Sequence, residues 1–258
     1  MTIEFHDAAA ELASLCGDFE AMEQFIERVI AQAKSLLEQV NVYRIKIQAK
    51  VSQTQLTEAI LIARQLLQKL GVTFPETPTQ KDTQQITAEI EQLIGDREIE
   101  DLVHLPMMTD EEKIAIVQIV NRIIPAAYFS DFLLYPLLIS LSVKLSIQYG
   151  NTPASAFAYC SYSIIACNLL QDVDTGVKFG QLALQVVSKL DAKAFKPEVL
   201  VTVGLFTVHR KSHIKETLPI LQESYATTLE VGNLEMAGYS AQNFCLNAFW
   251  CGQRLDTL

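Results

Sequence analysis

Two short stretches near the start of the chain decide the fold: Gly17-Asp18-Phe19-Glu20-Ala21-Met22 and, 37 residues later, Thr54-Gln55-Leu56-Thr57-Glu58-Ala59. In both, a polar pair precedes an apolar residue, and a second small or apolar residue follows three positions later. Gly17 can adopt the left-handed conformation that ends a helix, and Asp18 can cap the free amides of the next helix. The two stretches therefore predict turns between helices at a regular interval.

The same pattern returns in the second half of the chain. Further copies begin at Gln171, Ser212 and Gly252, and the spacing in each half is roughly 37 to 42 residues, close to the ~34 residues of a tetratricopeptide unit. One helical hairpin cannot bury both of its apolar faces, whereas stacked hairpins bury a continuous core. We therefore expect an all-α fold of stacked antiparallel helical hairpins, a tetratricopeptide-like α-solenoid.

Small residues are spaced for close contact between such helices. Ala59 and Ala63 lie four residues apart, and so do Gly176 and Gly180, which places each pair on one helix face. The glycine pair has a second interpretation as a phosphate-binding loop. No Lys-Ser or Lys-Thr follows it, so a close helix crossing is favoured.

Apolar residues recur at helical spacing almost throughout, and we expect three parts. Residues 1–71 form a first helical-repeat block, 72–105 a proline-containing spacer with one helix, and 106–258 a second block. Thr109 with Glu112 fits a capping box at the start of the second block.

Two further expectations concern the length of segments. In the first block a long helix is expected from about residue 33 to 51. At the other end, Leu255 would begin the partner helix of a last hairpin, but the sequence stops at Leu258. We therefore expect a fragment of a longer array, cut in the middle of a hairpin, that can self-associate through its open C-terminal end.

The composition is that of a folded helical protein rather than a nucleic-acid or membrane binder. Half of the 258 residues are apolar, only 10 are Gly and 8 are Pro, and the net charge is −10. Long helices need few turn residues, and an acidic surface repels phosphate backbones and anionic lipids. We expect no nucleic-acid partner. We also expect no membrane insertion, because charged residues and prolines interrupt the apolar stretch 114–147.

The cysteines and the start of the chain predict the compartment. None of the five cysteines forms a CxxC pair, which argues against a zinc ribbon or a thioredoxin-like motif. Cys160 and Cys167 lie on one helix face and are interpreted as buried apolar residues. Met1-Thr2-Ile3-Glu4 lacks the positive and apolar regions of an export signal. Reduced thiols without a signal peptide predict a cytoplasmic protein.

Motifs for catalysis or cofactor binding are absent from the sequence. It contains no Walker loop and no GxGxxG, HExxH or GxSxG pattern. His209 and His213 stand four residues apart, as metal ligands on a helix can, but only Glu216 accompanies them in a turn region. We expect no catalytic residue, no cofactor and no metal, and hence no enzyme activity in this chain. An enzyme with an unfamiliar helical site stays a minor alternative.

Aromatic residues gather in the middle of the chain, between about residues 128 and 162. Packing between hairpins is the commoner use of such residues and is favoured. The alternative is a surface or groove that binds a partner. Five of these residues are selected as its candidates: Tyr128, Phe132, Tyr135, Tyr159 and Tyr162.

Several longer strings carry a family resemblance: Asp101-Leu102-Val103-His104-Leu105-Pro106-Met107-Met108-Thr109-Asp110, Tyr149-Gly150-Asn151-Thr152-Pro153-Ala154-Ser155-Ala156-Phe157-Ala158-Tyr159, Gly176-Val177-Lys178-Phe179-Gly180-Gln181-Leu182-Ala183 and Ala237-Gly238-Tyr239. With these strings the whole chain resembles a helical region of large bacterial signalling proteins. Those proteins join a serine/threonine kinase domain, a P-loop ATPase domain and a C-terminal sensor histidine kinase. The region lies between the ATPase and histidine kinase parts and contributes no catalytic residue.

The resemblance implies a role in signal transduction as spacer and docking surface. Two hypotheses follow. In the first, the chain is a non-catalytic scaffold whose partners are adjacent domains of a parent kinase or other signalling proteins. In the second, the chain is a helical-repeat sensor whose aromatic residues bind a peptide or a small ligand.

Overall fold

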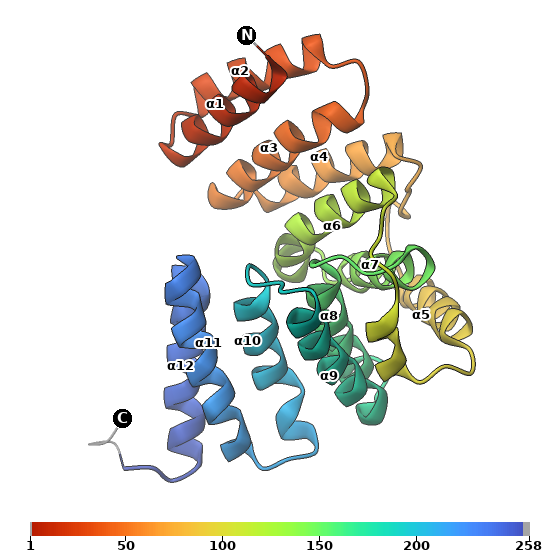
Figure 1. Ribbon diagram of the computed structural model, residues 1–258, viewed down its shortest axis with the longest axis vertical. Helices are drawn as coiled ribbons and strands as arrows, with labels where there is room; N and C mark the ends of the chain where they lie inside the picture. Colours follow the sequence, from red (N-terminus) through yellow and green to blue (C-terminus); the bar gives the residue numbers. More distant parts are fainter. Residues whose placement is uncertain (1, 255–258) are drawn as a thin grey trace. The chain divides into compact units, whose positions relative to one another are not determined.

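The computed structural model describes residues 2–254, and within that range the chain is helical, without a strand (Figure 1). An isolated bridge joins Met107 and Asn151. The α-helices are α1 Ile3–Leu15, α2 Phe19–Gln32, α3 Val40–Ser52, α4 Leu56–Lys69, α5 Gln80–Ile94, α6 Glu111–Ser130, α7 Tyr135–Tyr149, α8 Ser155–Asn168, α9 Val173–Lys189, α10 Lys196–Phe206, α11 Thr217–Val231 and α12 Leu234–Trp250. Short 3-10 helices are η1 Leu37–Gln39, η2 Ile99–His104, η3 Val208–Arg210 and η4 Ile214–Glu216.

The turn between α1 and α2 forms as the sequence predicts. Gly17 adopts a left-handed φ of 75°, and the side chain of Asp18 accepts a hydrogen bond of 3.0 Å from the amide of Ala21. This cap satisfies one of the amides left free at a helix start. At the start of α6 the cap is one residue later than predicted. Asp110, rather than Thr109, caps that helix.

The long helix expected from about residue 33 to 51 is wrong in its first third. Ala33 is extended, with a ψ of 133°, and α3 starts only at Val40. Between them the side chain of Glu38 accepts from the amide of Lys34 at 2.7 Å, and the amide of Glu38 donates to Ser35 Oγ at 3.3 Å. Such local bonds offer the backbone an alternative to the helix and break it without Gly or Pro.

The chain divides into two compact units that differ from the expected blocks. Unit 1 comprises Met1–Ile86 and Thr109–Leu138, and unit 2 comprises Thr87–Met108 and Ile139–Leu258. The residues of α6 belong with the N-terminal helices because α6 packs on both α3 and α4. Burial of apolar faces, not position along the chain, sets this grouping.

Within unit 1, neighbouring helices share a core. Helix α1 packs on α2 and α3, and α3 packs on α4. Ala10 of α1, Met22 and Ile26 of α2, and Val42 of α3 belong to one buried cluster. Ala59 on α4 is fully buried, which confirms the prediction that small residues lie at helix contacts.

Within unit 2, α8, α9, α10, α11 and α12 pack successively on one another. The two glycines of α9 lie where helices approach closely. A Cβ at Gly176 would lie 2.3 Å from Cys167 Sγ, and a Cβ at Gly180 would lie 2.8 Å from the Cγ2 atom of Thr207. The helix-crossing interpretation of Gly176 and Gly180 is thus confirmed.

Two further expectations concern the chain end and the membrane. The helix predicted to begin at Leu255 lies outside the described residues. Among residues 2–254, none of the helices combines the length and the apolar character that crossing a bilayer requires.

Candidate functional site

An exposed group of aromatic rings lies where α6 ends and α7 begins, inside unit 1. Tyr128 makes edge contacts with Phe129 and Tyr135, at centroid distances of 5.2 Å and 5.3 Å, and Phe132 stacks on Tyr135 at 6.2 Å. Tyr135 is buried, whereas Phe129 is 70%, Phe132 54% and Tyr128 39% exposed. We call Tyr128, Phe129, Phe132 and Tyr135 the aromatic patch.

The aromatic patch exposes two of the five predicted surface residues, Tyr128 and Phe132, and it adds Phe129 to them. Tyr135, a third predicted surface residue, is only 4% exposed and supports the ring of Phe132 instead of facing solvent, so it is corrected as a surface residue. Large exposed aromatic groups are uncommon on monomeric surfaces and are enriched in protein interfaces. Phe129 has the most exposed ring of the four. Its position next to Tyr128 was the signal in the sequence.

Tyr159 and Tyr162, the other two predicted surface residues, are buried in unit 2, with exposures of 0% and 1%. As surface candidates they are corrected here. Both lie on α8, a helix that is buried on nearly every side. Its sequence therefore has no alternation of apolar and polar faces from which the exposed side chains could be predicted. Each packs against Phe179 of α9, with ring centroids 6.0 Å and 4.6 Å away.

Tyr159 has a structural role. Its hydroxyl donates to Asn151 Oδ1 at 2.8 Å, and Asn151 Nδ2 donates to the carbonyl of Leu102 at 2.8 Å. Burial raises the pKa of Tyr159 well above its usual value, so the hydroxyl keeps its proton.

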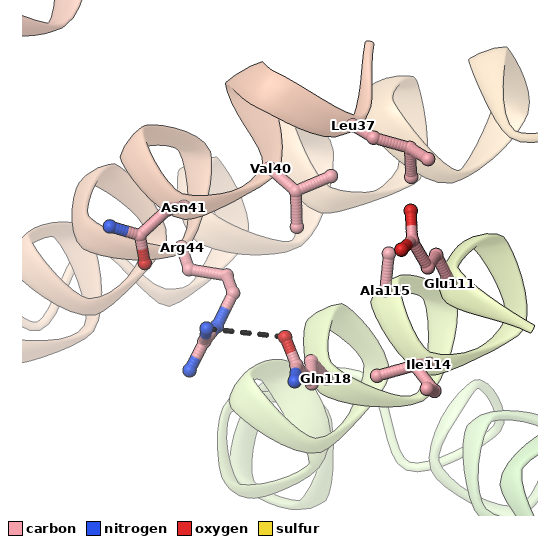
Figure 2. Close-up of a pocket in the computed structure, with 8 residues that line it drawn as sticks. All are labelled: Leu37, Val40, Asn41, Arg44, Glu111, Ile114, Ala115 and Gln118. Atoms are coloured by element: carbon pink, nitrogen blue, oxygen red, sulfur yellow. Dashed lines mark hydrogen bonds between the residues drawn. The ribbon is translucent and has the colours of Figure 1, made fainter. Parts of the chain in front are cut away.

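Unit 1 holds a small groove between α3 and α6, with a volume of about 270 Å³. Figure 2 shows the guanidinium of Arg44 reaching from α3 to the amide of Gln118 on α6, a hydrogen bond of 3.2 Å. The groove is lined by Leu37, Val40, Asn41, Arg44, Glu111, Ile114, Ala115 and Gln118.

The charge at Arg44 is poorly compensated. Its buried Nε has no hydrogen-bond partner among the described residues. Burial lowers the pKa of Arg44, the nearby Arg122 lowers it further, and Glu11 acts in the opposite direction. Asn41, Arg44 and Gln118 were not singled out in the sequence, although the three-residue spacing of Asn41 and Arg44 places them on one helix face.

Unit 2 holds a larger cleft of about 570 Å³, formed by the C-terminal part of α5, the segment into η2, and α8 and α9. Apolar and charged side chains share its wall. We call this the unit 2 cleft, and it is lined by Ile90, Glu91, Ile94, Gly95, Arg97, Glu98, Ile99, Tyr162, Leu170, Asp172, Thr175, Lys178 and Phe179. Its volume lies in the range typical of small-ligand pockets.

Tyr162 is the buried polar group of this cleft. Burial raises the pKa of Tyr162 far above its usual value, and the negative charges of Glu91 and Asp172 raise it further. The two carboxylates line the same cleft as Tyr162. No hydrogen bond to that hydroxyl is found within the described part of the chain. Although Tyr162 is not a surface residue, it does line a cavity.

The histidines and thiols show no arrangement for chemistry. Burial lowers the pKa of His209, while His213 Nδ1 accepts a hydrogen bond of 3.1 Å from the amide of Lys215. Over residues 2–254, no three His, Cys, Asp or Glu side chains are grouped to hold a metal ion. Cys160 and Cys167 are buried as predicted, and burial raises the pKa of the Cys160 thiol to about 12, which keeps it unreactive.

The chain is in part similar to part of a known signalling protein. Over 134 residues, 51% of its length, it is 22% identical to hybrid signal transduction histidine kinase G of Dictyostelium discoideum. The matching part spans 4% of that protein. No protein-family model and no solved structure matches the chain. The chain is therefore weakly similar, over about half of its length, to a small part of that signalling protein.

Proposed function

We propose that the chain is a non-catalytic, tetratricopeptide-like helical scaffold for protein–protein or interdomain contacts in signal transduction. The aromatic patch of unit 1 carries this proposal. Exposed aromatic side chains are the residues that most often dominate binding energy at protein interfaces. Their rings contact one another, so the surface is organised before a partner arrives, which lowers the entropy cost of binding.

Two other observations support the repeat and signalling parts of the proposal. Helix α1 contacts α2 and α3, and α3 contacts α4 and α6, an order of contacts typical of stacked hairpins. The weak relative is a histidine kinase of signal transduction. The proposed partners are adjacent domains of a parent kinase, other signalling proteins or a second copy of the chain.

The proposed compartment is the cytoplasm. All five cysteines are free thiols, two of them exposed, and a reducing compartment keeps such thiols unpaired.

Site-specific photo-crosslinking tests the scaffold function. A photoreactive benzoylphenylalanine replaces Phe129 in the aromatic patch, and in a matched control it replaces Gln24, an exposed residue on α2 of the same unit. We expect a discrete crosslinked partner from position 129 alone. The crosslink should disappear when Tyr128 and Phe132 are changed to Ser.

Two results would contradict the proposal. Equal crosslinking from positions 24 and 129 would mean that the patch has no selective partner. Hydrolysis of ATP or autophosphorylation by the purified chain would mean that the chain is an enzyme.

A further inference from the structure

The unit 2 cleft combines an apolar wall with an unpaired negative charge. Its two basic residues already have partners. The guanidinium of Arg97 donates hydrogen bonds to the backbone carbonyls of Leu93 and Ile94, the latter from Nε at 3.1 Å. The Nζ atom of Lys178 lies 3.0 Å from a carboxylate oxygen of Glu98. Both cations are thus engaged by their own surroundings.

The carboxylates of Glu91 and Asp172 have no ion-pair partner in the part of the chain that the structure describes, whereas the two basic groups are already engaged. Glu91 has neither a hydrogen bond nor an ion pair among the described residues. Asp172 accepts from the amide of Thr175 at 3.0 Å as the cap of α9, and no basic group of residues 2–254 lies within ion-pair distance of it. Lys211 acts on Asp172 only at longer range and pairs with Asp174 instead. The Tyr162 end of the cleft therefore carries an excess of negative charge.

Tyr162 adds an unused hydrogen-bonding group at the same place. The side chain is 1% exposed and its ring packs against Phe179, with centroids 4.6 Å apart. Glu91 and Asp172 line the same cleft as Tyr162, and both are exposed to it. The hydroxyl oxygen is not one of the fully buried atoms that lack a partner, so solvent reaches it through the cleft, and a ligand that supplies an N–H donor would take the place of that solvent.

We propose that the unit 2 cleft binds a primary ammonium group on an apolar stem. The ammonium group donates hydrogen bonds to the Tyr162 hydroxyl and to the carboxylates of Glu91 and Asp172. The stem lies against apolar side chains of the wall, such as Ile94 and Phe179. An anionic ligand is disfavoured by the two carboxylates, and a neutral apolar ligand would leave the hydroxyl without a partner.

The same chemistry has two sources, a free small amine or a lysine side chain of a peptide. The site lies in a different unit from the aromatic patch, so this proposal does not depend on the scaffold function.

Calorimetric titration of the full chain tests the proposal. Hexylamine is the probe, and hexanol is the neutral control with the same stem. We expect saturable binding of hexylamine and none of hexanol. Tyr162→Phe and Glu91→Gln should each weaken hexylamine binding about tenfold or more, the typical size of a hydrogen bond to a charged group. Glu91 is exposed, so its substitution keeps the fold even if Tyr162→Phe disturbs the core.

Glu230→Gln is the matched control, because Glu230 is an exposed carboxylate on α11 of the same unit. It should leave binding unchanged. Capped lysine methylamide, compared with hexylamine, distinguishes the sources: equal binding identifies a peptide side chain, and selective binding of hexylamine identifies a free amine. Absence of hexylamine binding, equal binding of hexanol, or equal losses in Glu91→Gln and Glu230→Gln would overturn the proposal.

Discussion

The hydroxyl of Tyr159 on α8 and the side-chain amide of Asn151 form a fully buried hydrogen bond of 2.8 Å. Asn151 also joins two other segments of unit 2. Its backbone amide donates to Pro106 at 2.8 Å, and its carbonyl accepts from Met108 at 2.9 Å. Asn151 thus holds the segment after η2 against the start of α8.

Tyr159→Phe should lower the free energy of unfolding by about 1 to 3 kcal/mol, because it leaves the buried Asn151 oxygen without its donor. Urea denaturation measures the effect. Tyr225→Phe is the control on an exposed ring and should change stability by less than about 0.5 kcal/mol. Equal stability of the two variants would show that the Tyr159 bond contributes nothing to the fold.

Two glycine substitutions should change stability in opposite directions. Gly176→Ala places a Cβ 2.3 Å from Cys167 Sγ and 3.0 Å from the carbonyl of Ser163, so helices must move apart. A loss of about 1 to 3 kcal/mol is expected from such overpacking. Gly238→Ala on α12 meets nothing within 4 Å and should stabilise by up to about 1 kcal/mol through helix propensity. Thermal unfolding compares them, and a gain of stability in Gly176→Ala would contradict the close crossing.

A charge introduced into α4 should be costly on one face only. Ala59 is fully buried, so Ala59→Glu places a carboxylate without a partner between packed helices and should cost at least about 3 kcal/mol. Leu61 is exposed on the same helix, and Leu61→Glu should cost less than about 1 kcal/mol. Chemical denaturation of both variants checks the orientation of α4, which an unchanged stability of Ala59→Glu would disprove.

Asp7 on α1 should make the stability of unit 1 depend on pH. Burial raises the pKa of Asp7 above 3.8, a hydrogen bond from Asn41 partly opposes the shift, and Glu11 adds to it. The folded state therefore holds the proton more tightly than the unfolded state. Stability due to this group falls as pH rises from the unfolded pKa through the folded pKa.

Asp7→Asn should remove the loss of folding stability that the Asp7 carboxyl causes as the pH rises. Its stability relative to the wild type should rise as the pH increases above 3.8, the pKa of this group in the unfolded chain, measured by urea denaturation at a series of pH values. Glu27→Gln, at an exposed carboxylate on α2, should show no comparable rise. A falling difference between Asp7→Asn and wild type would mean that the pKa of Asp7 is lowered.

The helices and several of their contacts could be predicted because they depend on local chemistry. Gly17 and Asp18 predicted a turn between helices, because few other residues adopt the left-handed conformation or cap a helix start as well. Gly176 and Gly180 predicted a close helix crossing, because only residues without a larger side chain fit there. The sequence did not predict the break at residues 33–39, because this segment contains no Gly or Pro, the usual signals of a helix end. The break arises from side-chain hydrogen bonds of Ser35 and Glu38 that compete with the helix.

The candidate sites were only partly predictable. Aromatic composition pointed to the segment that holds the aromatic patch, but it does not separate an exposed ring such as Phe132 from a buried ring such as Tyr162. The unit 2 cleft brings Glu91 together with Asp172, residues that are far apart along the chain. The placement of residues so distant in sequence around one cleft depends on tertiary packing, so it could not be predicted from the pattern of any one segment.

The chain passes from unit 1 to unit 2 after Ile86, returns at Thr109 and leaves again after Leu138. This path has a genetic consequence. A single recombination crossover or stop codon cannot deliver both units whole, because every cut divides the residues of at least one of them. Exchanging either unit alone between genes would require three junctions, after Ile86, Met108 and Leu138.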